Sequence, residues 1–288
     1  TWTGESFSQR GIESARLDAE VLLAHVLECD RIYLYTHWDR PLNKDERDEY
    51  RSLVKRRAVF EPVAYLIGYR EFYSRNFKVN SKVLVPRPES EHLVDIVIDW
   101  SQNASHSSSP LKILDLCTGS GNIGITLALE IDNAQVTSCD LCPHALEIAR
   151  ENARVLGPEK RLNFKEGDLF APVHDHTFDV IVANPPYVED TPNPPLPPDV
   201  DKYEPALALY SGKEGLDLIT RLCAEVHHYL RGEGLFVCEM GDLQVPRIIK
   251  ELEHQNYWDT VRHFQDLSRL RRGVIATKCI ASQKPSRF

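Results

Sequence analysis

From residue 112 onward, short apolar runs alternate with longer segments whose apolar positions recur at helical spacing. The pattern predicts strands at 112–117, 134–139, 162–166, 178–183 and 234–239, and helices at 122–130, 143–156, 216–230 and 243–256. Such alternation indicates an α/β fold with a parallel, doubly wound sheet. Two more strands, 259–265 and 273–279, have no helix between them, so we expect an antiparallel pair at one edge of the sheet.

Residues 1–67 have a helical pattern throughout. Leu17, Val21, Ala24 and Leu27 recur at helical spacing and predict one apolar face. An asparagine at 43 with a glutamate three residues later predicts a capped helix that runs to about residue 60. We therefore expect a small helical bundle over residues 1–67.

Residues 68–102 form a second unit with three short apolar runs, at 71–73, 77–79 and 83–85. Asn80 and Ser81 are a turn signal and predict a hairpin between the last two runs. A helix follows to about Trp100. The polar stretch 103–110 is typical of an exposed linker, and it opens a third unit over residues 103–288.

Charge and composition narrow the function classes. The formal net charge of -9 argues against general binding to nucleic-acid backbones, and we interpret the basic clusters at 55–57 and 269–272 as solvated surface. No apolar run approaches membrane-spanning length. Cys139-x-x-Cys142 has no second pair at metal spacing, so we assign it to core packing and expect no metal site. Reduced cysteines would suit an intracellular protein.

The segment 118–122 joins the first strand of the alternation to a helix. Glycines at Gly119 and Gly121 let backbone N–H groups approach a ligand at a helix N-terminus. Asp140 ends the second strand about 20 positions later, where a carboxylate can accept both hydroxyls of a ribose. Gly119-x-Gly121-x-x-Gly124 also fits the dinucleotide fingerprint, so a nicotinamide-dependent dehydrogenase stays open on this loop alone.

Three features favour S-adenosylmethionine over a dinucleotide. Asp115 lies inside the first strand, where it can meet the amino-acid part of a methionine, and Asp168 follows the third strand, within reach of an adenine ring. The third feature is Asn-Pro-Pro-Tyr at 184–187, directly after the fourth strand. Ligands of such sheets bind at the carboxyl ends of the strands, so all these groups belong to one edge.

The Asn-Pro-Pro-Tyr sequence suits a planar amide or amine substrate. The Asn184 side chain and the Pro185 and Pro186 carbonyls can accept hydrogen bonds, and the Tyr187 ring can stack. A proline-terminated strand and turn is the structural alternative.

These residues resemble class I S-adenosylmethionine-dependent methyltransferases that methylate amino groups, and more closely the HemK/PrmC family. The further motifs are Ser-Ala-Arg-Leu-Asp-Ala-Glu at 14–20, Pro-Val-Ala-Tyr-Leu-Ile-Gly at 62–68, Glu-Phe-Tyr at 71–73, Val-Pro-Arg-Pro-Glu-Ser-Glu at 85–91 and Tyr-Glu-Pro at 203–205. Cys117 stands where the family usually has glycine, Ser90 replaces a usual threonine, and 267–272 departs from the family pattern and receives no role.

The resemblance implies N5-methylation of the glutamine in the Gly-Gly-Gln motif of class I peptide chain release factors, with S-adenosylhomocysteine as the second product. It implies a cofactor site made of Asp115, Cys117, Thr118, Gly119, Ser120, Gly121, Asp140, Asp168, Leu169 and Asn184. Asn184, Pro185, Pro186 and Tyr187 would hold the glutamine, with Asn184, Pro185 and Tyr187 as the catalytic set and no general base.

Residues 1–67 would dock the protein substrate, and the proline-rich segment 188–205 would form either a flap or a surface loop. We expect a cytoplasmic monomer that binds no nucleic acid stably and no membrane; a mitochondrial matrix location and a trimmed leader stay open. Two alternatives are a nucleic-acid adenine N6-methyltransferase, which shares Asn-Pro-Pro-Tyr, and a non-enzymatic protein that binds S-adenosylmethionine.

Overall fold

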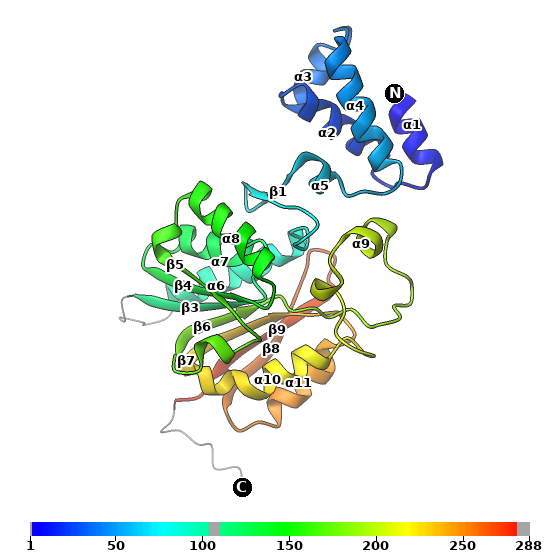
Figure 1. Ribbon diagram of the computed structural model, residues 1–288. Helices are drawn as coiled ribbons and strands as arrows, with labels where there is room; N and C mark the ends of the chain where they lie inside the picture. The colour runs from blue at the N-terminus through cyan, green and yellow to red at the C-terminus, as the bar shows by residue number, and fades with distance from the viewer. Residues whose placement is uncertain (1, 104–109, 281–288) are drawn as a thin grey trace.

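A seven-stranded, mostly parallel sheet forms the centre of the structure, a computed structural model that describes residues 2–103 and 110–280 (Figure 1). Its strands are β3 Leu111–Leu116, β4 Ala134–Asp140, β5 Leu162–Glu166, β6 Phe178–Ala183, β7 Leu230–Glu239, β8 Trp258–Gln265 and β9 Arg271–Lys278. They lie in the order β5-β4-β3-β6-β7-β9-β8. The strands β3 to β7 are parallel, and β9 runs antiparallel to both β7 and β8. The predicted doubly wound sheet and its antiparallel edge are confirmed.

Helices cover both faces of this sheet. The helices α6 Glu91–Asn103 and α7 Asn122–Glu130 lie on one face with α8 Pro143–Leu156, and α10 Asp217–Tyr229 and α11 Val245–Glu253 lie on the other (Figure 1). Residues of β6 alternate between the two layers: Val180 packs with the α6 and α7 side, and Ile181 packs with the α10 and α11 side. This period of two buries both faces of the strand, as a parallel sheet requires.

The N-terminal bundle consists of α1 Trp2–Gln9, α2 Ala15–Val26, α3 Arg31–Thr36, α4 Lys44–Arg57 and α5 Val63–Ile67. The capping box that begins α4 is present, because Asn43 Oδ1 accepts from Glu46 N and Glu46 Oε2 accepts from Asn43 N, both at 2.9 Å. The predicted face of α2 is wrong at Leu17, which is 45% exposed. Ala15, Ala19 and Leu22 form the buried stripe instead.

The hairpin lies one run earlier than predicted. It joins β1 Tyr69–Phe72 to β2 Arg75–Lys78, and the two turn residues Tyr73 and Ser74 both have positive φ, at 51° and 59°. Such a turn matches the twist of paired strands even without glycine. Asn80 does form a turn, with its Oδ1 accepting from Lys82 N at 2.9 Å, but residues 83–85 pair with no strand of the described chain.

Between β6 and α10 the chain leaves the sheet and returns. This segment contains α9 Pro198–Tyr203 and the short 3-10 helix Ala206–Ala208. Elsewhere in the described chain the 3-10 helices are Pro88–Ser90, Glu159–Arg161 and Ala171–Val173. The Tyr203 hydroxyl donates to the Val59 carbonyl at 2.9 Å, and Arg57 Nη1 donates to Asp199 Oδ2 at 3.4 Å. The proline-rich segment therefore connects the bundle with the sheet.

Candidate functional site

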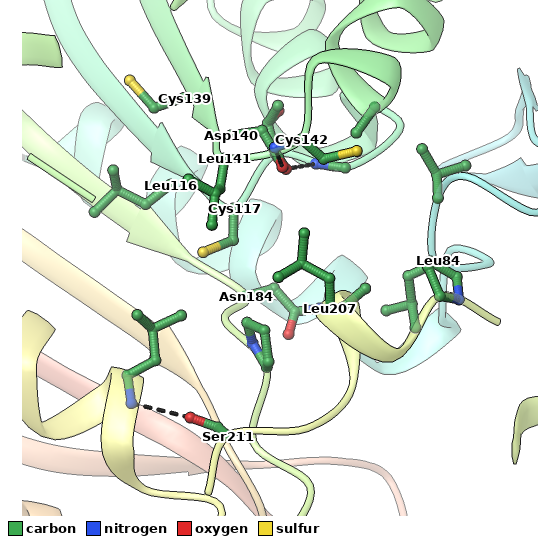
Figure 2. Close-up of a pocket in the computed structure, with 18 of the residues that line it drawn as sticks. Leu84, Leu116, Cys117, Cys139, Asp140, Leu141, Cys142, Asn184, Leu207 and Ser211 are labelled. Atoms are coloured by element: carbon green, nitrogen blue, oxygen red, sulfur yellow. Dashed lines mark hydrogen bonds between the residues drawn. The ribbon is translucent and has the colours of Figure 1, made fainter. Parts of the chain in front are cut away.

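A cavity of about 420 Å³ opens at the carboxyl ends of β3, β4, β5 and β6 (Figure 2). Its position follows from strand order: the chain runs from β3 outward to β4 and β5, and then returns to place β6 on the other side of β3. This is the topological switch point, where open α/β sheets bind ligands. The volume lies in the range of small-molecule sites.

The loop after β3 forms one wall of the cavity. Thr118, Gly119 and Ser120 line it, together with Cys117. Cys117, Gly119 and Gly121 all have positive φ, at 58°, 55° and 81°. The loop thus places a cysteine in a backbone region that glycine normally occupies, and only the two glycines adopt it without steric cost.

Gly119 and Gly121 have different surroundings. A Cβ built on Gly119 would meet nothing within 4 Å, so this residue presents bare backbone to open space. A Cβ on Gly121 would lie 2.7 Å from Ile125 Cδ1 and 3.1 Å from Ala149 Cβ, so packing excludes a side chain at this position. Gly121 does not line the cavity and acts in closing the turn, with its N–H donating to the Thr118 carbonyl at 2.8 Å.

Asp115 lies behind the loop and is not among the residues that line the cavity, and its expected contact with a methionine group stays a prediction. Its Oδ2 accepts from Thr118 Oγ1 at 2.5 Å, from Gly124 N at 3.1 Å and from Ser138 Oγ at 3.3 Å, while Oδ1 has no partner. A Cβ on Gly124 would lie 2.6 Å from this carboxylate. Asp115 thus ties the loop to α7, and burial raises its pKa to about 7.

Asp140 lines the cavity at the end of β4 and binds the glycine loop at the same time. Its Oδ2 accepts from Gly119 N at 2.8 Å, and its Oδ1 accepts from Cys142 N at 2.9 Å (Figure 2). Burial raises the pKa of Asp140, and the backbone donors of Cys142 and Gly119 oppose that shift. Each oxygen has a lone pair left for a hydroxyl group.

Asp168 and Leu169 also line the cavity, from the loop after β5. Asp168 Oδ2 accepts from Arg221 Nη2 at 2.6 Å, so α10 holds this carboxylate. Leu169 is buried, with a φ of 46°. With Leu141 and Cys142 it gives the cavity an apolar slot beside the two carboxylates.

Asn184 lies in the opposite wall, among Cys117, Leu207 and Ser211 (Figure 2). Its Nδ2 donates to Ser90 Oγ at 3.0 Å. Among the described residues, no hydrogen bond ends on Asn184 Oδ1 or on the Pro185 carbonyl oxygen. The Asn-Pro-Pro turn therefore holds two acceptors that the protein itself does not use.

The four residues of that turn are not equivalent. Asn184 and Pro186 line the cavity, whereas Pro185 and Tyr187 do not, and the expected stacking role of the tyrosine stays a prediction. The Tyr187 ring packs against the core on the α10 and α11 side, and its hydroxyl donates to Glu239 Oε1 at 3.3 Å. Burial, with the carboxylate of Glu239 beside it, raises the pKa of Tyr187.

Sequence reasoning gave no role to several residues near the cavity. Arg87 Nη2 donates to Glu204 Oε1 at 2.6 Å, and Val85 N donates to the other oxygen at 3.1 Å. Ser90 Oγ donates to Glu239 Oε2 at 2.6 Å. Arg87, Ser90 and Glu204 lie inside the family motifs, and that position in the sequence could have indicated a role in the site. Glu239 lies at the end of a buried strand, where the sequence pattern gives no such indication.

The residues around the cavity fit S-adenosylmethionine. Gly119 offers bare backbone, Asp140 offers a carboxylate with free lone pairs, and Leu141 and Leu169 offer an apolar slot for a planar ring. A carboxylate that accepts hydroxyl groups suits a ribose.

Comparisons with known proteins agree with this geometry. The PrmC N-terminal domain family matches residues 1–68, and the methyltransferase small domain family matches residues 102–194. A release factor glutamine methyltransferase of Rhodopirellula baltica is 41% identical over 256 residues, which cover 88% of this chain and 86% of that protein. One of Leptospira interrogans is 38% identical and covers 95% of both chains.

Solved structures show the fold. The catalytic domain of hMettl16, in complex with the MAT2A 3′UTR hairpin 1, has a TM-score of 0.57 at 14% identity, over 83% of this chain and 82% of that chain. A methyltransferase of Pyrococcus furiosus has a TM-score of 0.51 at 19% identity, over 73% of this chain and 91% of that chain. The fold is that of a class I methyltransferase, for which S-adenosylmethionine is the cofactor. The identity to full-length relatives settles the rest: this chain belongs to the release factor glutamine methyltransferase family.

Proposed function

We propose that this protein transfers a methyl group from S-adenosylmethionine to the side-chain nitrogen of the glutamine in the Gly-Gly-Gln motif of class I release factors. The observation that carries the proposal is an unused acceptor, Asn184 Oδ1, on a residue that lines a cavity fitting the cofactor, followed in the chain by the unused Pro185 carbonyl. A primary amide has two N–H groups, which this pair matches. The relatives are named for this activity.

The chemistry demands orientation of the substrate. An amide nitrogen is a poor nucleophile because its lone pair is delocalised into the carbonyl group. If Asn184 Oδ1 and the Pro185 carbonyl each accept one N–H, the amide is held in a single orientation against the cofactor. Orientation of this kind supplies about 7–11 kcal/mol in the best cases. As the nitrogen bonds to the methyl carbon, the bond from that carbon to sulfur breaks and S-adenosylhomocysteine leaves. The methylated nitrogen is then acidic and releases one proton to water.

When bound, S-adenosylmethionine supplies an electrophilic methyl group on a sulfonium. We propose that Thr118, Gly119 and Ser120 contact it through the loop, with Asp140 on its ribose and Asp168 and Leu169 at its ring. Cys117 lines the same wall. Gly121 and Asp115 hold the loop from behind, and Asn184 lies between cofactor and substrate.

We propose residues 1–67 as the docking domain for the release factor, 68–102 as the connecting unit and 103–288 as the methyltransferase domain. Exposed apolar side chains on and just after α3 support the docking role. The helix buries none of its residues, and Ile32 and Trp38 are 75% and 84% exposed. Large apolar side chains left exposed close together in the chain favour a protein-binding role.

The rival substrate class is nucleic acid. Its phosphates need free basic side chains, yet Arg56 binds Glu61, Arg271 binds Asp242 and Arg272 binds Asp266. Both basic clusters of the sequence are thus partly neutralised, which supports a protein substrate. No helix of the described residues is long and apolar enough to cross a membrane.

We further propose a cytoplasmic monomer. All seven cysteines are free thiols, which suits a reducing compartment. Light scattering coupled to size-exclusion chromatography measures the oligomeric state directly.

The deciding experiment incubates the protein with S-adenosylmethionine labelled in its methyl group and a class I release factor. We expect label in the factor that carries Gly-Gly-Gln and none in a matched factor whose motif is Gly-Gly-Ala. Label in both factors would place the methyl group on another residue. Label only in an added RNA or DNA would establish the nucleic-acid alternative.

A further inference from the structure

The side chain of Asn184 has two ends that are nearly equal in shape and opposite in hydrogen bonding. Its oxygen accepts, its nitrogen donates, and rotation by 180° about the terminal bond exchanges them. A substrate amide that presents N–H groups can bind only the oxygen end. Activity at this site therefore depends on whatever determines which end of the amide faces the cavity.

A chain of two hydrogen bonds links Asn184 to a buried carboxylate. Asn184 Nδ2 donates to Ser90 Oγ at 3.0 Å, and Ser90 Oγ donates to Glu239 Oε2 at 2.6 Å. Ser90 comes from the 3-10 helix Pro88–Ser90 and Glu239 from the end of β7, so residues 149 positions apart meet directly behind Asn184. Ser90 and Glu239 are 1% and 2% exposed, so the bond between them is shielded from water, and Ser90 also lines the cavity beside Asn184.

The direction of this chain is set by the carboxylate. A serine hydroxyl has one proton, and Ser90 donates it to Glu239, which as a carboxylate can only accept. Burial raises the pKa of Glu239, and the hydrogen bonds from Ser90 and Tyr187 oppose that shift and favour the carboxylate. Ser90 Oγ then has only lone pairs to offer Asn184. The Asn184 nitrogen can donate to those lone pairs, whereas the Asn184 oxygen in the same place would be repelled by them. The second oxygen of Glu239 accepts from the Tyr187 hydroxyl at 3.3 Å, so both of its oxygens have donors.

We propose that Ser90 and Glu239 are positioning residues that hold the Asn184 amide with its nitrogen toward Ser90 and its oxygen toward the substrate. The inference rests on the proposed function for its catalytic consequence. Its structural part, the fixed orientation of one side-chain amide, is independent of the substrate. Tyr187 belongs to the same device through Glu239 instead of contacting the glutamine.

The first test compares Ser90→Ala with Ser90→Thr, which restores a hydroxyl, and with Ser101→Ala. Ser101 is the matched control because its hydroxyl donates to the Ile98 carbonyl within α6 and does not line the cavity. We expect kcat for release factor methylation to fall about tenfold in Ser90→Ala, as for loss of one hydrogen bond of ordinary net strength. We expect Ser90→Thr and Ser101→Ala to keep kcat near the wild-type value, and the Kd for S-adenosylmethionine to stay unchanged in all three.

The second test needs no turnover. In the protein without cofactor, the side-chain NH2 group of Asn184 gives a pair of NMR signals, identified by their loss in Asn184→Asp. We expect slow hydrogen exchange of these protons in the wild type, and markedly faster exchange in Ser90→Ala. Ser90→Cys, which nearly keeps the side-chain volume and whose sulfur is a weaker acceptor for the Asn184 nitrogen, should lie between them and replaces Ser90→Ala if that variant does not fold.

Wild-type kcat in Ser90→Ala, or unchanged exchange of the Asn184 amide protons, would overturn the positioning role. A failure of the proposed function has a different signature. The wild-type protein would then leave the release factor unlabelled, while the exchange experiment would still report whether Ser90 holds the amide.

Discussion

Asp140 Oδ2 accepts a hydrogen bond from the backbone N–H of Gly119 at 2.8 Å. The bond joins the loop after β4 to the loop after β3, at the point where both line the cavity. One carboxylate therefore shapes the glycine loop and also presents lone pairs to a ligand.

Asp140→Ala should weaken binding of S-adenosylmethionine. The variant loses both the ribose acceptor and the bond that holds Gly119, and hydrogen bonds to charged groups contribute about 1.5–3 kcal/mol each. We expect Kd, measured by isothermal titration calorimetry, to rise by about 10-fold or more. Asp242→Ala removes a half-buried carboxylate that binds Arg271 outside the cavity lining and serves as the control. An unchanged Kd in Asp140→Ala would refute the ribose role.

Asn184→Ala should separate binding from turnover. The cofactor contacts of the loop and of Asp140 stay intact, while one acceptor for the substrate amide is lost. We expect kcat to fall by on the order of 10²-fold, as when one positioned hydrogen bond in a transition state is removed, with little change in cofactor Kd. Asn76→Ala, at an exposed residue that does not line the cavity, is a matched control. Wild-type turnover in Asn184→Ala would contradict the assignment.

Trp38→Ser tests the docking surface. Trp38 is 84% exposed, so its replacement should leave the free energy of unfolding near the wild-type value. We expect KM for the whole release factor to rise about tenfold, with kcat at saturation and cofactor Kd unchanged, because a buried aromatic anchor at an interface contributes about 1–2 kcal/mol or more. Leu243→Ser, at a residue that is 88% exposed between β7 and α11, is the control. Equal KM values for the two variants would remove the docking proposal.

Asp18→Ala should destabilise the bundle. Asp18 Oδ2 and Arg57 Nε are 2.7 Å apart, and both side chains are almost fully buried. Removal of one partner leaves a buried charge, which costs about 3–5 kcal/mol. Arg57 keeps bonds to the Phe60 and Glu61 carbonyls and to Asp199, so we expect the lower end of that range in urea unfolding. Asp48→Ala breaks an exposed pair with Arg51 and should cost about 0–1 kcal/mol.

The pKa of Asp115, raised by burial from 3.8 to about 7, predicts a pH-dependent stability. Between these values the folded state binds more protons than the unfolded state, so the free energy of unfolding falls as pH rises from about 4 to about 7. The slope reaches at most about 1.4 kcal/mol per pH unit. Asp115→Asn should flatten that part of the profile while keeping an oxygen for Thr118, Gly124 and Ser138. Parallel profiles for both proteins, from urea unfolding at a series of pH values, would contradict the prediction.

The sheet, its edge pair and the glycine loop were predictable because their signals are local. Apolar runs such as 178–183 are buried on both faces, and Gly119 and Gly121 stand where the backbone needs positive φ. The hairpin prediction failed because Tyr73 and Ser74 adopt positive φ without glycine, which no turn rule based on composition detects.

The missed part of the site is non-local. Ser90 and Glu239 are 149 positions apart in the sequence. Nothing in the sequence near either residue indicates that the two form a hydrogen bond. An aromatic ring at Tyr187 predicts stacking on a flat ligand, whereas the sequence does not indicate that its hydroxyl binds Glu239 or that its ring packs against the core. The side that a residue faces after a strand ends depends on packing that the sequence pattern does not contain.

The helix α9 has a mechanical consequence. It is bonded to the bundle through Asp199 and Tyr203, and the chain that follows it reaches Leu207 in the cavity wall within a few residues. A rotation of the bundle relative to the sheet that keeps the bonds of Asp199 and Tyr203 would displace α9, and with it the residues that lead to Leu207. A protein substrate that binds the bundle would therefore also be coupled, through α9, to the cavity wall next to Asn184.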